Sequence, residues 1–329
     1  MKIAKRTLSL LLALCLICGM AGCGKSDVKA EDTAPSAASE PAPEQTASPA
    51  PESSVTVTDM KGREITLEEP AERIVALTAS DCEILYAIGA GDTLVGRGTY
   101  CDYPAEVADV PAVQSGADTN IEQIIALEPD VLLMSDMAQT EEQIAQLEAA
   151  GISVVVSQAT DIDGVYDAVA MIGKLMGKEE NAAAVIENMK TTFADIQAKS
   201  AGDGTQTVYF EVSPLQWGLW TAGAHTFMDE IAAMLGLKNC FADVEDWAEI
   251  SEEQVLERNP DFIVTITMYF GEGPTPEEEI LSRAGWENLT AVKNNAVLNL
   301  QNNELSRPAP RLADGAQMLF DFVYGGAAD

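Results

Sequence analysis

One pattern of fourteen residues occurs twice in the chain, with the second copy 131 positions after the first. The first copy reads Asn120-Ile-Glu-Gln-Ile-Ile-Ala-Leu-Glu-Pro-Asp-Val-Leu-Leu, and the second reads Ser251-Glu-Glu-Gln-Val-Leu-Glu-Arg-Asn-Pro-Asp-Phe-Ile-Val. Each copy predicts the same unit, namely a capping residue, a helix with an acid in its first turn, a Pro-Asp break and a buried strand. We therefore expect two lobes that are built alike.

Strands and helices are predicted to alternate through both halves. Short strands are predicted at 55–59, 63–67, 74–77, 131–134, 154–156 and 208–212. The first two form a hairpin around Met60-Lys61-Gly62. Helices are predicted at 83–88, for which Ser80 is a candidate cap, and at 141–150. Continuous apolar strands that alternate with helices are typical of a parallel sheet covered on both faces.

The segment 178–200 predicts one long helix, because it lacks proline and glycine and carries apolar residues at helical spacing. At 1.5 Å per residue this helix is about 34 Å long, enough to run along a pair of lobes. The predicted fold class is thus α/β, with two Rossmann-like lobes of parallel sheets, one long connecting helix and a ligand cleft between the lobes. The predicted N-terminal lobe spans 55–177 and the C-terminal lobe spans 201–329.

The N-terminus has the layout of a secretory signal, with basic residues followed by a short apolar run at 8–18. That run leads into Met20-Ala-Gly-Cys23, which resembles a bacterial lipobox with methionine in place of the usual leucine. The resemblance implies a lipoprotein signal peptide at 1–22 and a lipid on Cys23 that anchors the chain to the outer face of a membrane. An ordinary cleaved signal with an incidental cysteine is the alternative.

The composition after Cys23 predicts a flexible tether. Residues 24–54 are almost entirely Ala, Ser, Pro, Glu, Gln and Thr, which bury too little apolar surface to fold. We therefore interpret 23–54 as the lipidated cysteine and a disordered linker. The formal net charge of −34 excludes a basic footprint for nucleic acid and a basic grip on anionic lipid. Cys82, Cys101 and Cys240 remain in the domain, and one pair of them can form a disulfide.

Four segments resemble the periplasmic-binding-protein family that serves importers of vitamin B12, iron siderophores and haem. They are Arg73-Ile-Val-Ala-Leu-Thr, Ala87-Ile-Gly-Ala-Gly-Asp-Thr-Leu-Val-Gly96, the first repeat copy, and Trp247-Ala-Glu-Ile-Ser-Glu-Glu-Gln254. The resemblance implies two α/β lobes joined by one long helix and a monomeric protein that delivers a small molecule to an importer. No catalytic site and no resident cofactor are expected.

The resemblance also gives a role to Glu122 and Glu253, which occupy equivalent places in the two repeat copies. In this family such glutamates lie at the tips of the lobes and dock on arginines of the dimeric permease of an ABC importer. The alternative is that each acid only compensates its helix dipole. Both roles are compatible.

The expected ligand is a corrinoid such as cobalamin. Cobalamin binders of the family resemble this chain at Trp247, at Arg307-Pro-Ala-Pro-Arg311 and at Tyr100-Cys-Asp-Tyr103-Pro, but they often carry an acid where this chain has Asn303. A large amphipathic macrocycle suits a wide cleft lined by aromatic side chains. The candidate ligand-binding residues are Ser80, Tyr100, Tyr103, Trp217, Trp220, Trp247, Tyr269 and Arg307. Trp286 is expected in the core.

Ferric siderophore and haem remain alternatives within the same class of importer. Anionic siderophores need converging basic groups, for which the candidates are Arg97, Arg307 and Arg311. Haem needs an axial ligand, for which the candidates are His225, Tyr100, Tyr103, Tyr269 and Met268. Capture of bare zinc or manganese is not expected, because His225 is the only histidine. Its expected place is the start of a helix at 226–235.

Two other classes of protein are less well supported. The chain has no nucleophile elbow, no phosphate-binding Gly-x-x-x-x-Gly-Lys loop and no His-Glu-x-x-His motif, so an anchored enzyme is disfavoured. An adhesion or structural protein is also disfavoured, because such a function does not require two matched helix tips. The visible colour of the purified protein would separate these classes, since corrinoids, haem and many ferric complexes absorb visible light.

Overall fold

The computed structural model of the chain describes residues 54–116, 119–135, 140–269, 271–300 and 304–325. The predicted signal peptide, Cys23, the linker up to residue 53 and Asn303 lie outside these ranges. In the part of the chain that is described, no helix is long and apolar enough to cross a membrane.

The N-terminal lobe opens with the expected hairpin, in which β1 (Val55–Thr58) pairs antiparallel with β2 (Glu64–Leu67). A five-stranded parallel sheet follows in the order β5-β4-β3-β6-β7. Its strands are β3 (Ile74–Ala76), β4 (Leu94–Gly98), β5 (Ala112–Val113), β6 (Val131–Met134) and β7 (Ser153–Val156). The helices of the lobe are α1 (Ala79–Ala87), α2 (Ile121–Ala126), α3 (Glu141–Ala149) and α4 (Ile162–Leu175).

The C-terminal lobe is built around β8 (Thr207–Ser213), which pairs in parallel with β10 (Lys238–Asn239) and β12 (Phe262–Thr265). The strand β13 (Val297–Asn299) pairs in parallel with β12. The expectation of a parallel sheet in each lobe is confirmed. The strand β9 (Trp220–Ala222) pairs antiparallel with β8 on one side and with β11 (Trp247–Glu249) on the other. The connection from β8 to β9 is too short for a crossover helix, so the chain turns back.

Five α-helices are found among the described residues of the C-terminal lobe. They are α6 (Phe227–Met234), α7 (Glu252–Arg258), α8 (Pro276–Leu281), α9 (Thr290–Lys293) and α10 (Leu312–Tyr324). Neither α10 nor α4 is among the helices predicted from the sequence. The helix expected at 226–235 is α6, with Thr226 as its cap and His225 just before it.

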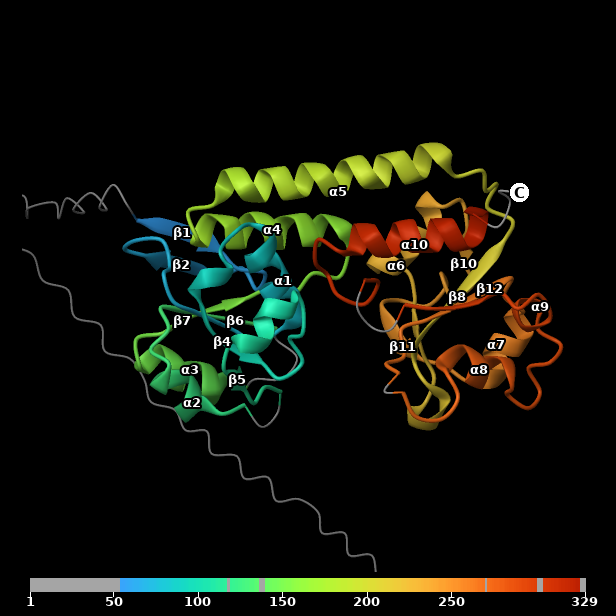
Figure 1. The fold of residues 1–329 in the computed structure, drawn as a ribbon, viewed down its shortest axis with the longest axis horizontal. Helices are drawn as coiled ribbons and strands as arrows, with labels where there is room; N and C mark the ends of the chain where they lie inside the picture. Colours follow the sequence, from blue (N-terminus) through green and yellow to red (C-terminus); the bar gives the residue numbers. More distant parts are fainter. Residues whose placement is uncertain (1–53, 117–118, 136–139, 270, 301–303, 326–329) are drawn as a thin grey trace, which may run out of the picture. The chain divides into compact units, whose positions relative to one another are not determined.

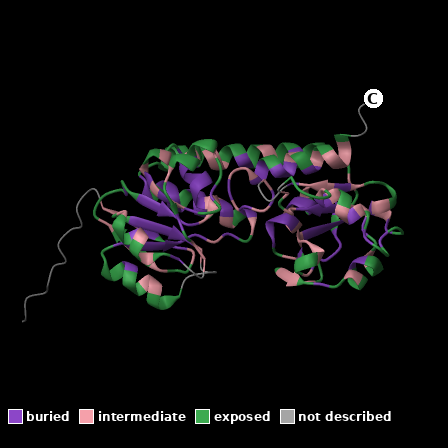
Figure 2. Cartoon of the chain, turned by 60° about the horizontal axis from the view of Figure 1, so that its bottom comes forward, coloured by how far each residue is buried: buried purple, intermediate pink, exposed green. Residues whose placement is uncertain are grey.

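The long helix expected at 178–200 is α5 (Glu179–Lys199), which is about 32 Å long at 1.5 Å per residue. It packs on α4 of the N-terminal lobe and on α10 and α6 of the C-terminal lobe (Figure 1). Its buried side chains are Ala182, Met189, Phe193 and Ile196, which all belong to the predicted apolar stripe. Figure 2 shows the opposite side of this helix exposed. One helix therefore covers part of the core of both lobes.

Alternate residues of each central strand enter different cores, as the two-residue period of a strand requires. In β3, Ile74 and Ala76 join the core under α1, α4 and α5, whereas Val75 joins the core under α2 and α3. In β8, Phe210 and Tyr209 divide in the same way between the core under α6 and α10 and the core under α7, α8 and α9. Both sheets are thus covered on two faces.

The two repeat copies have the same structure. Asp130 accepts hydrogen bonds from the backbone N–H groups of Glu72 and Arg73 just before β3, each at 2.9 Å. Asp261 accepts one from Thr207 at the start of β8, at 2.8 Å. The aspartate of each Pro-Asp step therefore hydrogen-bonds to the backbone at or just before the first strand of its sheet. The prediction that the two lobes are built alike is confirmed.

The predicted cap of α1 is wrong. The cap is Thr78, whose side-chain oxygen accepts from the N–H of Asp81 at 3.2 Å, and Ser80 is already inside the helix. The helix begins earlier than predicted because the β-branched Thr78 has extended backbone angles that leave its hydroxyl beside the first turn.

Candidate ligand-binding site

A pocket of about 640 Å³ lies in the C-terminal lobe, at the carboxyl ends of β8 and β12. Ligands of α/β sheets bind at this edge, because the loops that follow parallel strands meet there. The described residues that line the pocket are Glu211, Val212, Pro214, Leu215, Gln216, Trp217, Ile266, Thr267, Met268, Tyr269, Glu272, Pro274, Pro276 and Glu279. Two of the predicted ligand-binding residues, Trp217 and Tyr269, are among them.

The aromatic and thioether side chains of this pocket are available for contact. Trp217 is 76% exposed and Met268 is 41% exposed, although both are large and apolar. Tyr269 is half-buried, and its hydroxyl donates to the carbonyl oxygen of Gly273 at 3.2 Å. An exposed indole that packs on little of its own protein is suited to stacking on a ligand.

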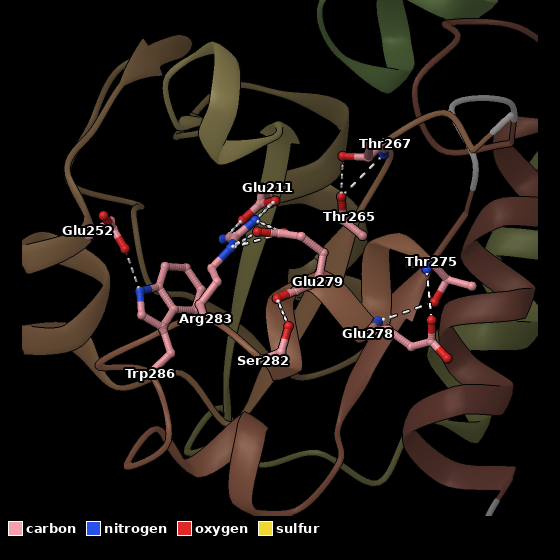
Figure 3. Close-up of polar contacts among 10 residues, drawn as sticks. All are labelled: Glu211, Glu252, Thr265, Thr267, Thr275, Glu278, Glu279, Ser282, Arg283 and Trp286. Atoms are coloured by element: carbon pink, nitrogen blue, oxygen red, sulfur yellow. Dashed lines mark hydrogen bonds and ion pairs between the residues drawn. The ribbon is translucent and has the colours of Figure 1, made fainter. Parts of the chain in front are cut away.

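An ion cluster that includes two lining residues of the pocket, here called the pocket floor, joins the buried Arg283 and Glu211 to the more exposed Glu279 (Figure 3). Arg283 donates to both carboxylate oxygens of Glu211, at 2.6 and 2.9 Å, and its Nε donates to both oxygens of Glu279, at 3.0 and 3.1 Å. Burial works against the charge of Arg283, but these hydrogen bonds outweigh it and raise its pKa. For Glu211, burial outweighs the bonds to Arg283 and raises the pKa. One arginine thus faces two acids.

The same arginine contacts a residue that reaches the start of α7. Its guanidinium group lies 4.5 Å from the centre of the Trp286 ring, and the indole N–H of Trp286 donates to Glu252 at 3.0 Å (Figure 3). Trp286 is fully buried, as predicted from the sequence. The pocket floor is therefore held in place by the core of the lobe.

A second pocket, of about 480 Å³, lies where the two lobes meet. Its lining residues are Glu83, Tyr86, Ala87, Tyr103, Pro104, Glu106, Pro310 and Arg311. The Arg311 guanidinium lies 3.7 Å from the centre of the Tyr103 ring. The loop that carries Tyr103 and the segment that carries Arg311 are thus brought together, although they are far apart in the sequence.

Arg307 and Arg311 form a cross-lobe ion cluster with three acids. Arg307 donates to Glu83 at 3.0 Å and to Asp102 at 2.6 Å. Arg311 donates to Glu83 at 2.6 and 3.0 Å and to Glu304 at 2.9 Å. Burial opposes the charge on both arginines, yet the bonds to the carboxylates prevail and raise the pKa of each.

The cross-lobe ion cluster changes what the arginines can offer to a ligand. Arg307, a predicted ligand-binding residue, is only 8% exposed and already has two carboxylate partners. Arg97, another candidate for an anionic ligand, donates to the carbonyl oxygens of Val110, Gly98 and Cys101. These arginines are engaged within the protein.

The remaining predicted ligand residues do not line either pocket. Tyr100 is 74% exposed in the loop before Tyr103, and Trp220 is 39% exposed on β9. Trp247 is half-buried against Phe227, with ring centres 5.4 Å apart. Ser80 is half-buried in α1, and its hydroxyl donates to Thr78 at 3.3 Å.

Glu122 and Glu253 occupy the second position of α2 and α7, and both are exposed. Asn120 and Ser251 cap these helices as predicted, by accepting from the backbone N–H groups of Gln123 and Gln254. Hydrogen bonds from its own backbone and from Ser251 lower the pKa of Glu253. In Figure 1, α2 and α7 lie on the faces of their sheets that point away from α5.

The described residues contain no group of histidine, cysteine and acidic side chains that could hold a metal ion. His225 is exposed and lies 3.3 Å from Glu245. Cys82, Cys101 and Cys240 are buried and unbonded.

Several residues of the site are not among those predicted from the sequence. Glu211 carries a detectable signal, because it is one charged residue inside the apolar strand Val-Tyr-Phe-Glu-Val. Glu83, Glu279 and Arg283 lie on or beside short helices, where charged residues are ordinary, and they carry no such signal. Asp102 is part of a segment that the resemblance had singled out only for its tyrosines.

A model of the periplasmic binding protein family matches residues 74–304. The chain belongs to that family. Among curated proteins, an uncharacterized ABC transporter substrate-binding lipoprotein of Bacillus subtilis (strain 168), YvrC, is 34% identical over 276 residues, which are 82% of this chain and 85% of that protein. A vitamin B12-binding protein of Yersinia pestis (strain Pestoides F) is 31% identical over 255 residues, with 76% and 86% covered. The binding protein is a component of a transporter and not an enzyme.

Solved structures of the family have the same fold. The periplasmic vitamin B12 binding protein BtuF of Vibrio cholerae aligns with a TM-score of 0.65 at 26% identity, over 79% of this chain and 99% of that chain. The periplasmic heme binding protein HutB of Vibrio cholerae aligns with a TM-score of 0.70 at 21% identity, over 77% and 98%, and shows the fold alone. The predicted α/β architecture of two lobes is confirmed.

Proposed function

We propose that this periplasmic binding protein captures a corrinoid and delivers it to an ABC importer. The observation that carries the proposal is the charge around the two pockets. Glu211, Glu272 and Glu279 line the C-terminal pocket, and Arg283 is hydrogen-bonded to Glu211 and Glu279. A ligand at this pocket therefore meets a surplus of negative charge.

That surplus disfavours ligands with carboxylates. Haem carries two propionates, and many ferric siderophores are anionic, so both need free guanidinium or ammonium partners. Arg307 and Arg311 are occupied by Glu83, Asp102 and Glu304. A corrinoid with amide side chains is neutral at its rim and donates N–H groups, which carboxylate oxygens accept.

The exposed aromatic side chains support the same ligand class. Trp217, Tyr100 and Tyr103 are 76%, 74% and 43% exposed, and they offer flat apolar surfaces beside the two pockets or on the loop that leads to them. A macrocycle with apolar faces and a polar rim gains from contact with such surfaces. Resemblance to vitamin B12-binding proteins over three quarters of the chain points in the same direction.

Haem and ferric siderophore are the competing ligands of the same function. Haem is favoured by one observation, namely that Tyr103, Tyr269 and Met268 lie at the two pockets and can act as axial ligands. Binding of haem there would leave its propionates near Glu272 or Glu106, which is unfavourable unless a basic group is released from the cross-lobe ion cluster.

The decisive experiment is calorimetry of the mature protein with cyanocobalamin, haemin and a ferric hydroxamate. We expect binding of cyanocobalamin that weakens at least tenfold, about 1.4 kcal/mol, in Trp217→Ala. Met318→Ala serves as a control, because Met318 is an exposed apolar residue of α10 that lines neither pocket. Tight binding of haemin or of the ferric hydroxamate, with no response to cyanocobalamin, would replace the corrinoid by that ligand.

Docking on the permease completes the proposed function. Glu122 and Glu253 are exposed at matching positions of two matching helices, so a permease dimer can present one basic site to each. The anchor on Cys23 would hold the protein at the outer face of the membrane, next to the importer. The lipoprotein relative from Bacillus subtilis supports this placement.

A further inference from the structure

Two thiols lie together beside the cross-lobe ion cluster. Cys82 is in α1, Cys101 is in the loop after β4, and they are 0% and 1% exposed. Both Sγ atoms lie near the carbonyl oxygen of Ala76, at 3.8 and 3.9 Å. A hydrogen bond to Cys101, together with burial, raises the pKa of the Cys82 thiol. The two sulfur atoms therefore lie beside the same carbonyl group.

We propose that Cys82 and Cys101 are joined by a disulfide in the exported protein. The secretory signal and the family place the domain outside the cytoplasm, where thiols that can reach each other are oxidised. Cys240 is not a competing partner, because it follows β10 in the C-terminal lobe and packs in a different core. The bond would close a loop of about 20 residues, a length at which a cross-link stabilises the fold.

The oxidant is a disulfide-bearing thiol oxidoreductase of the export compartment or a small-molecule disulfide. The thiolate of Cys82 attacks the disulfide of the oxidant, forms a mixed disulfide and expels one thiolate. The thiolate of Cys101 then attacks Sγ of Cys82 and expels the second thiolate. Two electrons pass to the oxidant. Its two sulfur atoms take up the two protons that the cysteines lose, so the oxidant ends as two thiols.

Burial sets when this reaction occurs. The folded protein disfavours the Cys82 thiolate, so exchange in the native state is slow in both directions. The bond therefore forms before α1 packs on β4, and afterwards it resists reductants that do not unfold the domain.

The position of the bond gives it a consequence for the site. Glu83 follows Cys82 and Asp102 follows Cys101 in the chain, and both acids bind the same Nη1 atom of Arg307. A covalent link between the two cysteines fixes the spacing of these two acids. The disulfide would thus hold the N-terminal half of the cross-lobe ion cluster in the geometry that Arg307 requires.

The test is a thiol map of the full chain, exported with its own signal. Membranes are collected in N-ethylmaleimide, the protein is denatured in the same reagent, and labelled cysteines are located by peptide mass with and without prior reduction of the denatured protein. We expect Cys240 to be labelled without reduction, and Cys82 and Cys101 to be labelled only after it. Labelling of Cys82 and Cys101 on most chains before reduction would overturn the proposal.

Two variants make the map specific. Cys101→Ala should free Cys82 for labelling without reduction, whereas Cys240→Ala should leave the pair protected. Reduction of the denatured protein, followed by refolding in a phosphine reductant, should lower the Tm of the wild type by about 5 °C or more and leave the Tm of Cys101→Ala unchanged. Equal effects of the reductant on both proteins would contradict the bond. If Cys101→Ala does not fold, the map of the wild-type chain still decides.

Discussion

Glu83 accepts two hydrogen bonds from Arg311, at 2.6 and 3.0 Å, although 228 positions separate the two residues in the chain. Its side chain is 1% exposed, and its other partner, Arg307, comes from the same segment before α10. One buried carboxylate of the N-terminal lobe therefore holds two arginines of the C-terminal lobe. The lobes are joined by charge at this point as well as by α5.

Replacement of Glu83 by glutamine should strongly destabilise the domain. The substitution leaves two largely buried guanidinium groups with one anionic partner fewer, and breaking a buried ion pair costs about 3–5 kcal/mol. Denaturation in urea, monitored by circular dichroism, measures the effect. Glu304→Gln is the matched control, because Glu304 is more exposed and makes one bond to Arg311; it should cost less than about 1 kcal/mol. Equal effects of the two variants would show that Glu83 does not hold the lobes together.

Asp81 should make the domain less stable as the pH rises from about 4 to 6. Complete burial raises its pKa to about 6, although hydrogen bonds from Thr78 and Ser157 oppose the shift, and one carboxylate oxygen has no partner. Between about pH 4 and 6 the folded state keeps a proton on Asp81 that the unfolded state has lost. The contribution of Asp81 to the free energy of unfolding is therefore full below about pH 4 and is lost as the pH rises through the folded pKa. The loss amounts to about 3 kcal/mol.

Asp81→Asn tests this prediction, since the amide keeps an acceptor for Thr78 and cannot ionise. The free energy of unfolding of the variant should lack the decline between pH 4 and 6 that Asp81 contributes, so the variant should exceed the wild type at pH 7 and match it near pH 4. Parallel pH profiles for the two proteins would exclude Asp81 as the source.

The double variant Glu122→Ala, Glu253→Ala should abolish uptake and leave ligand affinity and Tm close to the wild-type values. Both acids are exposed, so their loss removes little from the fold but removes both proposed contacts with the permease. Uptake of labelled cyanocobalamin by cells or proteoliposomes measures the loss.

Glu142→Ala is a matched control for docking, because Glu142 has the same second position in α3, after the cap Thr140. It should leave uptake normal. Normal uptake by a well-folded double variant would mean that Glu122 and Glu253 only stabilise the starts of their own helices.

Cys23→Ala should release the protein from the membrane or leave its signal uncleaved. The lipobox-like sequence around Cys23 motivates this prediction, which labelled fatty acid and fractionation of cells can check. Fatty acid that persists on the variant would place the anchor elsewhere.

The architecture could be predicted from local patterns in the sequence. The repeated copies around Glu122 and Glu253 required two similar lobes, and the apolar stripe of 178–200 required a long helix. These features depend on local periodicity and capping, which neighbouring residues decide. The interpretation of Trp286 as a core residue rested on the same reasoning about apolar side chains.

The chemistry of the site depends on contacts between segments that are far apart in the chain. Arg307 was predicted to face a ligand, yet it is held by Glu83 and Asp102, because the fold brings α1 and the loop after β4 beside the segment before α10. Arg283 likewise finds Glu211 72 positions away in the chain. Whether a charged side chain is free or paired depends on partners that are distant in the sequence. Local sequence patterns do not indicate which lobe supplies those partners.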